Sequence, residues 1–358
     1  MLFGYPSEAY SDNWLHEAIV QTLEVIHDRI DLDVDLSPWG EMLPASHRDA
    51  LENRPALRER FIGYARAFRK LGARSRAQVR RCIEEQNKIE QLLQNASGCD
   101  LFLELPKQIQ APIMSLFDFA FDLLTPLKIR DDQYKIIYEG NVKHVCPFCG
   151  IEYFDAPDGP REDLDHYLVK SKYPFAAANL QNLVPMGEKC NKKYKKAQDI
   201  LRDEHGIRRV AFYPYATSGV QVSLLNSQPF AGTDGRLPQW NIEFLPQSPE
   251  CDTWDAVFKI RTRYRRDVLD EKFFDWLGAF SDWVRNSRHA NGIGDVNQVA
   301  DVLRDYLEVL TSLRLAGCDF LRVMVFEMLI RHCVAGNQRI LLFLRDLLMP
   351  SPTSQAQA

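Results

Sequence analysis

The sequence predicts an α+β protein that is mostly helical and carries a small β-containing module near its centre. Three observations lead to this prediction. Apolar residues recur at three and four positions through "WLHEAIVQTLEVIHDRI" and "LRERFIGYARAFRKL", which is typical of amphipathic helices. The same spacing returns near the other end in "DYLEVLTSLRLAGCDFLRVMVFEMLIRHCV". Between them, β-branched and aromatic residues in "HVCPFCGIEYFD" favour a short hairpin.

These patterns divide the 358 residues into five segments. We expect a helical domain at 1–130, a strand-and-helix module at 131–215, a β-rich connector at 216–250, a second helical domain at 251–349 and a disordered tail at 350–358. The tail, "PSPTSQAQA", has no large apolar side chain to bury. The chemistry-bearing motifs all fall in the module at 131–215.

The composition is that of an ordinary globular protein. Hydrophobic residues make up 46% of the chain, which is enough for packed cores, and the net charge of -5 argues against a surface that is basic throughout. The first residues, "MLFGYPSEAYSDNW", lack the basic region of a secretory signal, and no apolar run reaches membrane-spanning length. We therefore expect a cytoplasmic protein that has no membrane partner.

Cysteine spacing indicates a metal site. Cys146 and Cys149 flank "PF", and two thiolates at this spacing can bind one zinc ion from a tight turn. Cys190 follows some forty residues later and would supply a third sulfur ligand of a structural zinc. Gly187 stands where a second cysteine pair would be completed. The fourth ligand stays open among His144, His205, a water and a more distant cysteine. The alternative is a packed thiol cluster without metal.

The stretch at 161–193 holds the second set of candidate functional residues. Its sequence is "REDLDHYLVKSKYPFAAANLQNLVPMGEKCNKK", in which Asp165 and His166 stand side by side. An isolated Asp-His pair is common, but "LDHYLVKSKYP", "NLVP" and "CN" follow here in order. Over residues 141–200 the chain resembles the HNH nuclease family, of the type that contains a CxxC pair. The resemblance implies a ββα-metal module, in which a hairpin, a loop and a helix bind one divalent cation.

Carried over by position, the resemblance implies a role for each of four side chains. Asp165 would be the acidic ligand of the catalytic cation, and His166 the general base. Asn182 would hold the loop and orient the base, and Asn191 would be the second cation ligand, on the helix. The chain departs from the family pattern at two positions, since Val169 stands where proline is usual and Gly187 where a third cysteine often is.

These residue types suit phosphodiester hydrolysis. A neutral imidazole with a pKa of about 6.5 can take the proton of an attacking water at cytoplasmic pH. A hard cation with open coordination positions stabilises the charge that grows on the phosphate and on the leaving oxygen. With only one carboxylate and one amide, the site would bind Mg²⁺ loosely, and Mn²⁺, Co²⁺ or Ni²⁺ would substitute.

Lysines cluster around Asn191. We expect contacts with a phosphate backbone from Lys189, Lys192, Lys193, Lys195 and Lys196. The alternative is an ordinary solvated helix surface. Two further basic runs carry the same alternatives. One comprises Arg58, Arg60, Arg66, Arg69, Lys70, Arg74, Arg76, Arg80 and Arg81, and the other comprises Lys259, Arg261, Arg263, Arg265 and Arg266, with Tyr264 between.

The leading hypothesis from the sequence is a metal-dependent HNH endonuclease that cuts DNA. A nucleic-acid-binding module without turnover and an RNA-cleaving HNH toxin are the alternatives. The large helical flanks resemble those of nucleases in bacterial anti-phage systems, including partners of an ATPase in Septu-like and retron-linked operons. The chain has no phosphate-binding loop of its own. An ATPase, if required, would therefore be a separate subunit. A restriction-type or homing role is a further alternative.

Overall fold

The structure is a computed structural model that describes residues 1–141, 143–160, 163–216, 219–231, 237–289, 298–312 and 318–348. Most of the described residues lie in helices, and small antiparallel sheets accompany them. The predicted α+β class with mostly helical content is therefore confirmed. The tail predicted at 350–358 lies outside the described residues.

The chain forms two compact units. The first consists of Met1–Gly219 and Ser248–Phe258, and the second of Val220–Gln247 and Lys259–Ala358. The candidate metal ligands, catalytic residues and lysines around Asn191 all belong to the first unit. The division of the chain into five segments stays a prediction.

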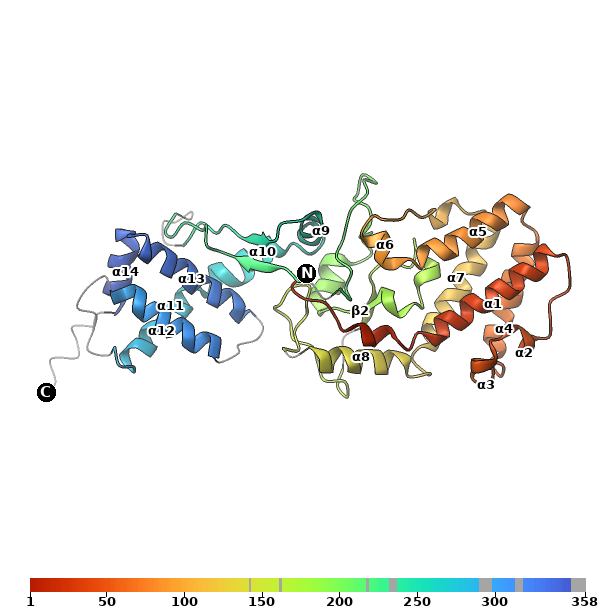
Figure 1. Ribbon diagram of the computed structural model, residues 1–358, viewed down its shortest axis with the longest axis horizontal. Coiled ribbons are helices and arrows are strands. Elements are labelled where there is room, and N and C mark those ends of the chain that lie inside the picture. The colour runs from red at the N-terminus through yellow and green to blue at the C-terminus, as the bar shows by residue number, and fades with distance from the viewer. Residues whose placement is uncertain are drawn as a thin grey trace. The chain divides into compact units, whose positions relative to one another are not determined.

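The first part of the first unit is helical. Its helices are α1 (Trp14–Asp31), α2 (Trp39–Met42), α3 (Arg48–Leu51), α4 (Pro55–Arg69), α5 (Ala73–Gln86), α6 (Ile89–Leu93), α7 (Lys107–Leu123) and α8 (Ile129–Gly140), with the short 3-10 helices η1 (Ser7–Tyr10), η2 (Ala45–His47) and η3 (Phe102–Glu104). Figure 1 shows α1, α4 and α7 close together, and these three helices contact one another.

Apolar residues at helical spacing explain this packing. In α4, Leu57, Phe61, Tyr64 and Phe68 recur every three or four positions, and none is more than 1% exposed. Pro55 begins the helix, where its missing N–H costs no hydrogen bond. Burying a side chain such as Leu or Phe contributes roughly 1.5–3 kcal/mol. Together these helices form the main core of the first unit.

Two short strands and a helix follow. Strand β1 (Leu164–His166) pairs antiparallel with β2 (Leu183–Pro185), which places Asp165 opposite Val184 and His166 opposite Leu183. The connection between the strands contains the 3-10 helices η4 (Pro174–Ala176) and η5 (Leu180–Asn182). After β2 comes η6 (Lys189–Lys195), a π-helix of seven residues.

Strands β1 and β2 and the connection between them contribute side chains to the same core as the helices. Leu164, Phe175 and Leu183 belong to the same buried cluster as the apolar faces of α1, α4 and α7. Phe175 meets Phe117 of α7 edge-on, with ring centroids 5.3 Å apart. The side chain of Gln133 in α8 donates a hydrogen bond to the carbonyl of Leu180 at 2.9 Å. The candidate catalytic residues are thus held by the N-terminal helices.

The remaining elements are α9 (Pro249–Phe258), which belongs to the first unit, and those of the second unit. The second unit contains β3 (Gln221–Ser223), β4 (Glu243–Leu245), α10 (Ile260–Arg263), η7 (Tyr264–Leu269), α11 (Asp270–Arg285), α12 (Val299–Ser312), α13 (Asp319–Val334) and α14 (Gln338–Leu348). Its core includes the aromatic trio of Phe280, Tyr306 and Phe326, whose ring centroids lie 4.9–5.4 Å apart.

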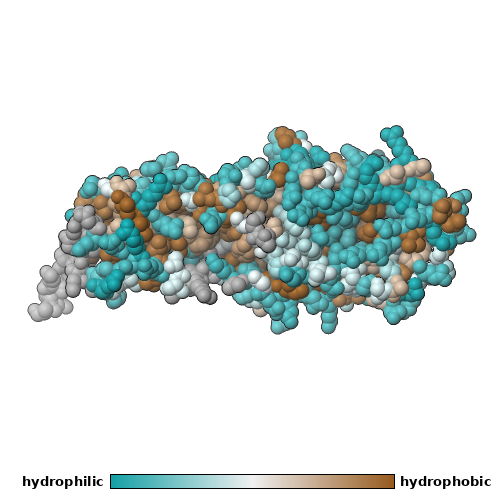
Figure 2. Space-filling view, viewed as in Figure 1, coloured by the Kyte–Doolittle hydropathy of each residue, from teal (hydrophilic) through white to brown (hydrophobic). Residues whose placement is uncertain are grey.

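Hydrophilic residues cover most of the face seen in Figure 2, and hydrophobic residues gather there in separate patches. Within the described ranges, every helix is too short or too polar to cross a lipid bilayer.

Candidate metal centre and catalytic site

The CxxC pair lies in a tight turn between two extended segments. Val145 forms an isolated antiparallel bridge with Tyr153, and the Cys146 N–H donates to the Glu152 carbonyl at 2.8 Å. The chain then turns back, with the Gly150 N–H donating to the Cys146 carbonyl at 2.7 Å. Gly150 has a φ of 66°, a conformation that glycine adopts without steric cost.

Cys190 joins this pair from the start of η6. The sulfurs of Cys146, Cys149 and Cys190 all lie within 4.8 Å of one another, and all three side chains are fully buried. Burial raises the pKa of the Cys146 thiol well above its usual value, and its neighbours Cys149 and Cys190 raise it further. A bound dication would reverse this effect, because it stabilises thiolates. The predicted gathering of three sulfurs is confirmed, and the cluster could hold a metal such as zinc.

Neither of the two histidines considered from the sequence as a fourth ligand lies at the thiol cluster. The His144 ring stacks on Tyr138 with centroids 4.0 Å apart, and its Nδ1 lies 3.1 Å from the Tyr138 carbonyl. The His205 ring is 75% exposed beside Glu204. Neither belongs to the thiol cluster, and among the described residues no further cysteine joins it. The carboxylate of Glu152 borders the cluster instead, a neighbour that the sequence reasoning missed.

Asp165 is held by a buried lysine. Its Oδ2 lies 2.6 Å from Nζ of Lys195, whose side chain is only 1% exposed. The same ammonium donates a hydrogen bond to the His166 carbonyl at 2.7 Å. Burial raises the pKa of the Asp165 carboxyl, and the charge of Lys195 offsets part of that rise. The ion pair thus favours the ionised form of a carboxyl whose burial favours the neutral form.

The structure defines the hydrogen bonding of the His166 ring. Its Nε2 lies 3.0 Å from the Ala177 carbonyl, and the ring centroid is 4.4 Å from that of Phe121. Because a carbonyl only accepts, Nε2 carries the proton and Nδ1 keeps a lone pair. Burial lowers the pKa of His166 to about 3, and the nearby charge of Lys170 lowers it too. The imidazole is therefore neutral at neutral pH, and it is a weaker base than the ring with a pKa of about 6.5 that was expected from the sequence.

Asn182 ties together the connection between β1 and β2. Its Oδ1 accepts from the Leu168 N–H at 2.6 Å, and its Nδ2 donates to the carbonyls of Leu168 and Ala176 at 3.0 and 3.1 Å. The side chain is fully buried. These bonds fix the segment that carries the Ala177 carbonyl, which in turn holds the ring of His166.

Asn191 of η6 lies apart from Asp165. It lines a polar pocket of about 510 Å³ together with Asp155, Asp163 and Glu188. Asp165 is not among the residues that line this pocket. The structure links Asn182 to the His166 ring through the backbone at Ala176 and Ala177, and it links Asp165 to the His166 carbonyl through Lys195. Asn191 lines one pocket with Asp163, an acidic residue two positions before Asp165 that the sequence reasoning did not select.

The lysines around Asn191 separate into two groups. Four are exposed, namely Lys189, Lys192, Lys193 and Lys196. Lys195 is a correction to the predicted basic patch, because its ammonium is buried against Asp165 and cannot face a phosphate backbone. The physical reason is that the methylene groups of Lys195 can be buried with apolar neighbours when the ammonium at their end pairs with a carboxylate.

The other basic runs are largely occupied by internal partners. In the N-terminal run, Arg76 and Arg80 both bind Asp31, at 3.1 and 2.8 Å, and Arg81 binds Asp100 at 2.9 Å. In the second run, Arg263 is 1% exposed, and the guanidinium of Arg261 lies 4.0 Å from the centroid of the Phe244 ring. These contacts engage part of each run within the protein, and the choice between phosphate contact and a solvated helix surface stays a prediction for the rest.

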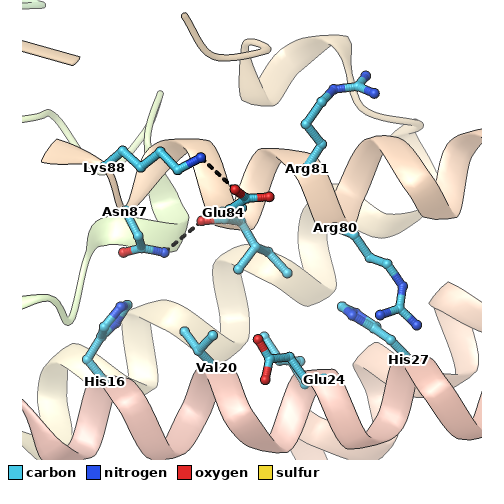
Figure 3. A pocket seen from close by; sticks show the side chains of 11 residues that line it. His16, Val20, Glu24, His27, Arg80, Arg81, Glu84, Asn87 and Lys88 are labelled. Atoms are coloured by element: carbon cyan, nitrogen blue, oxygen red, sulfur yellow. Dashed lines mark hydrogen bonds and ion pairs between the residues drawn. The ribbon is translucent and has the colours of Figure 1, made fainter. Parts of the chain in front are cut away.

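A second pocket, of about 740 Å³, lies between α1 and α5. Figure 3 shows His16, Glu24 and His27 on one side of it, and Glu84 with Lys88 on the other. Its charges are paired locally, since Lys88 Nζ lies 2.5 Å from Glu84 Oε1. None of the residues selected from the HNH-like motif lies in it.

Comparison with models of known protein families, with curated proteins and with solved structures finds no match to this chain. Its functional assignment therefore depends on its own residues and on the way the fold arranges them.

Proposed function

We propose that this chain is a metal-dependent endonuclease of the HNH type that hydrolyses phosphodiester bonds in DNA. The observation that carries the proposal is the hydrogen-bonded chain from Asn182 through the Ala177 segment to His166. It leaves a neutral imidazole whose Nδ1 keeps a lone pair, at the residue that follows Asp165 in β1. The order of elements supports the proposal as well, because β1, the connection, β2 and η6 follow one another as a ββα-metal module requires.

In the proposed mechanism, His166 is the general base. Its Nδ1 takes a proton from the water that attacks phosphorus, while the Nε2–H stays bonded to the Ala177 carbonyl. Asn182 is a positioning residue, since it acts on the base only through the backbone that it holds. The exposed lysines Lys189, Lys192, Lys193 and Lys196 would contact the phosphates on either side of the scissile bond.

Following the resemblance, the residues proposed to hold the catalytic Mg²⁺, or Mn²⁺ or Ni²⁺ in its place, are Asp165 and Asn191. Because Asn191 lines a pocket that Asp165 does not line, the two side chains have to approach each other to share one ion. When bound, such an ion stabilises the charge on the phosphate and on the leaving oxygen. Lys195 contacts Oδ2 of Asp165 and offsets part of the rise in pKa that burial causes, and its ammonium would compete with a cation for that oxygen. For the three buried thiols we propose a structural zinc, which would tie the CxxC turn to the start of η6.

A digestion panel tests the proposal directly. Purified protein is incubated with supercoiled plasmid, linear duplex, single-stranded DNA and RNA, each with Mg²⁺, with Mn²⁺ and with a chelator. Nicking or linearisation of the plasmid that requires the divalent ion is the expected result. A protein that retards DNA in a gel but leaves its topology unchanged under every condition would favour the alternative, a zinc-stabilised binding module without turnover. Cleavage of RNA alone would favour the toxin-like alternative.

We further propose that the nuclease acts in the cytoplasm as an effector of anti-phage defence. The support is the resemblance of its helical flanks to Septu-like and retron-linked nucleases, in which an ATPase is the partner. Co-expression with the product of the neighbouring gene, followed by copurification and cleavage assays with ATP, tests this role. Full activity of the isolated chain at physiological Mg²⁺ would count against control by such a partner.

A further inference from the structure

A carboxylate lies beside the three-thiol cluster, where the sequence leaves the fourth metal ligand open. Glu152 belongs to the same turn as the CxxC pair, because its carbonyl accepts the Cys146 N–H. Its Oε2 lies 3.7 Å from the sulfur of Cys149. Its Oε1 accepts a hydrogen bond from the Lys189 N–H at 2.8 Å. Lys189 directly precedes Cys190, so the side chain of Glu152 spans from the CxxC turn to the third cysteine.

The distance from Glu152 Oε2 to Cys149 Sγ fits two ligands of one tetrahedral ion, whereas the carboxylate does not lie within 4.8 Å of all three sulfurs and would move closer to the cluster on binding. With Zn–S near 2.3 Å, Zn–O near 2.1 Å and a tetrahedral angle, the two ligand atoms stand about 3.6 Å apart. The observed 3.7 Å between Glu152 Oε2 and Cys149 Sγ is close to this value. The bond from Lys189 to Oε1 occupies the other oxygen, which leaves Oε2 as the atom directed at the thiols.

Gly187 provides the space for this carboxylate. A Cβ added at Gly187 would lie 2.7 Å from both Cδ and Oε2 of Glu152, and 2.8 Å from its Cβ. A side chain at position 187 would therefore clash with the Glu152 side chain in its present conformation. Gly187 is also the position at which the resemblance leads one to expect a third cysteine. The carboxylate thus fills the volume that a side chain at position 187 would enter.

We propose that Glu152 is the fourth ligand of the metal bound by Cys146, Cys149 and Cys190. The inference depends on the zinc part of the proposed function and is independent of the nuclease part. Three thiolates and one carboxylate bring the same charge to the ion as four thiolates. Glu152 also lines the polar pocket that contains Asn191, so the oxygen ligand faces the more open side of the centre.

The test compares the full-length protein with three variants and a control. Glu152→Ala removes the ligand, whereas Glu152→Gln keeps an acceptor for the Lys189 N–H and loses the charge. The double variant Glu152→Gly/Gly187→Cys replaces the carboxylate by a thiolate from the facing position, and glycine at 152 removes the Cβ that would lie 2.8 Å from the new side chain. Asp155→Asn, which changes a carboxylate in the same pocket at a residue outside the cluster, is the matched control. Zinc content is measured after purification, and zinc affinity by competition with a chromogenic chelator.

One zinc per chain is expected for the wild type and for Asp155→Asn. We expect Glu152→Ala to weaken zinc binding by about 100-fold, Glu152→Gln to weaken it as well, and the double variant to recover it. Cobalt substitution gives a readout that a merely structural role would not change. The sulfur-to-cobalt charge-transfer absorption of the double variant should exceed that of the wild type in the ratio of four thiolates to three, and Glu152→Ala should shift the ligand-field bands.

If Glu152→Ala leaves the zinc affinity and the cobalt spectrum unchanged, the assignment is overturned. The fourth ligand would then be a water. A wild-type chain that binds neither zinc nor cobalt would overturn the assignment too. Zinc binding as expected in a protein that cleaves no nucleic acid would support the ligand assignment, and in that case only the nuclease proposal fails.

Discussion

Lys195 and Asp165 form a buried ion pair at 2.6 Å, and Asp165 directly precedes His166 in β1. The lysine comes from η6 and the aspartate from β1, thirty positions earlier in the chain. The ammonium of Lys195 also donates a hydrogen bond to the His166 carbonyl. It therefore holds the backbone of the proposed base and also favours the ionised form of Asp165, the proposed cation ligand. The pair therefore links the helix to the strand.

Removing this lysine should destabilise the fold. Lys195→Met keeps the apolar stem but leaves Asp165 buried without its partner, which typically costs about 3–5 kcal/mol. Urea denaturation should show this loss for Lys195→Met and almost none for Lys196→Met, whose side chain is exposed. The double variant Asp165→Asn/Lys195→Met should be more stable than the sum of the single losses implies. Additive losses would show that the two residues are not coupled.

Replacing the proposed base should stop cleavage without stopping binding. His166→Ala removes the nitrogen that accepts the proton, and we expect the nicking rate to fall by about 10²–10⁴-fold. Gel-shift affinity for DNA should stay near the wild-type value, and circular dichroism should show an intact fold. His205→Ala, at an exposed ring, is the control. Wild-type cleavage by His166→Ala would remove His166 from the mechanism.

The exposed lysines should set the salt dependence of DNA binding. Each phosphate contact contributes about one unit to the slope of log affinity against log salt. Lys192→Ala/Lys193→Ala should therefore lower the slope by about two and weaken binding at low salt, whereas Lys107→Ala, in the exposed first turn of α7, should not. Fluorescence anisotropy over a salt series measures both quantities. An unchanged slope would indicate that this face is only a solvated helix surface.

Two buried histidines should make the protein sensitive to acid. Burial lowers the pKa of His16 to about 4 and that of His27 to about 3. The unfolded chain, with histidine pKa values near 6.5, then binds protons that the folded chain does not. The unfolding free energy should be highest above about pH 6.5 and should fall by about 1.4 kcal/mol per pH unit for each histidine below it.

His27→Leu tests this dependence. The variant should be less stable at neutral pH, because it loses the hydrogen bond to Tyr64, yet its stability should fall less steeply on acidification. Denaturant titrations between pH 7 and pH 5 give the slope. His205→Gln should keep the wild-type slope, since its ring is exposed. Equal slopes for His27→Leu and the wild type would mean that His27 titrates alike in both states.

Much of the helical fold could be predicted because helical periodicity is a local signal. The apolar positions of α4 and α7 appear in the sequence at the spacing at which they are buried. Strands β1 and β2 have only three residues each and are held by contacts with α7 and α8. Such short strands carry too little periodicity of their own for their register to be read from the sequence.

The sequence by itself determined the CxxC pair and the Asp-His pair, because the spacing of ligands in a turn and the character of a motif are local properties. Only the tertiary structure decided that Lys195 is buried against Asp165 and that Glu152 occupies the space beside Gly187. Both arrangements join residues thirty or more positions apart, and the energy of a buried charge or of a shared volume depends on neighbours that only the folded chain supplies.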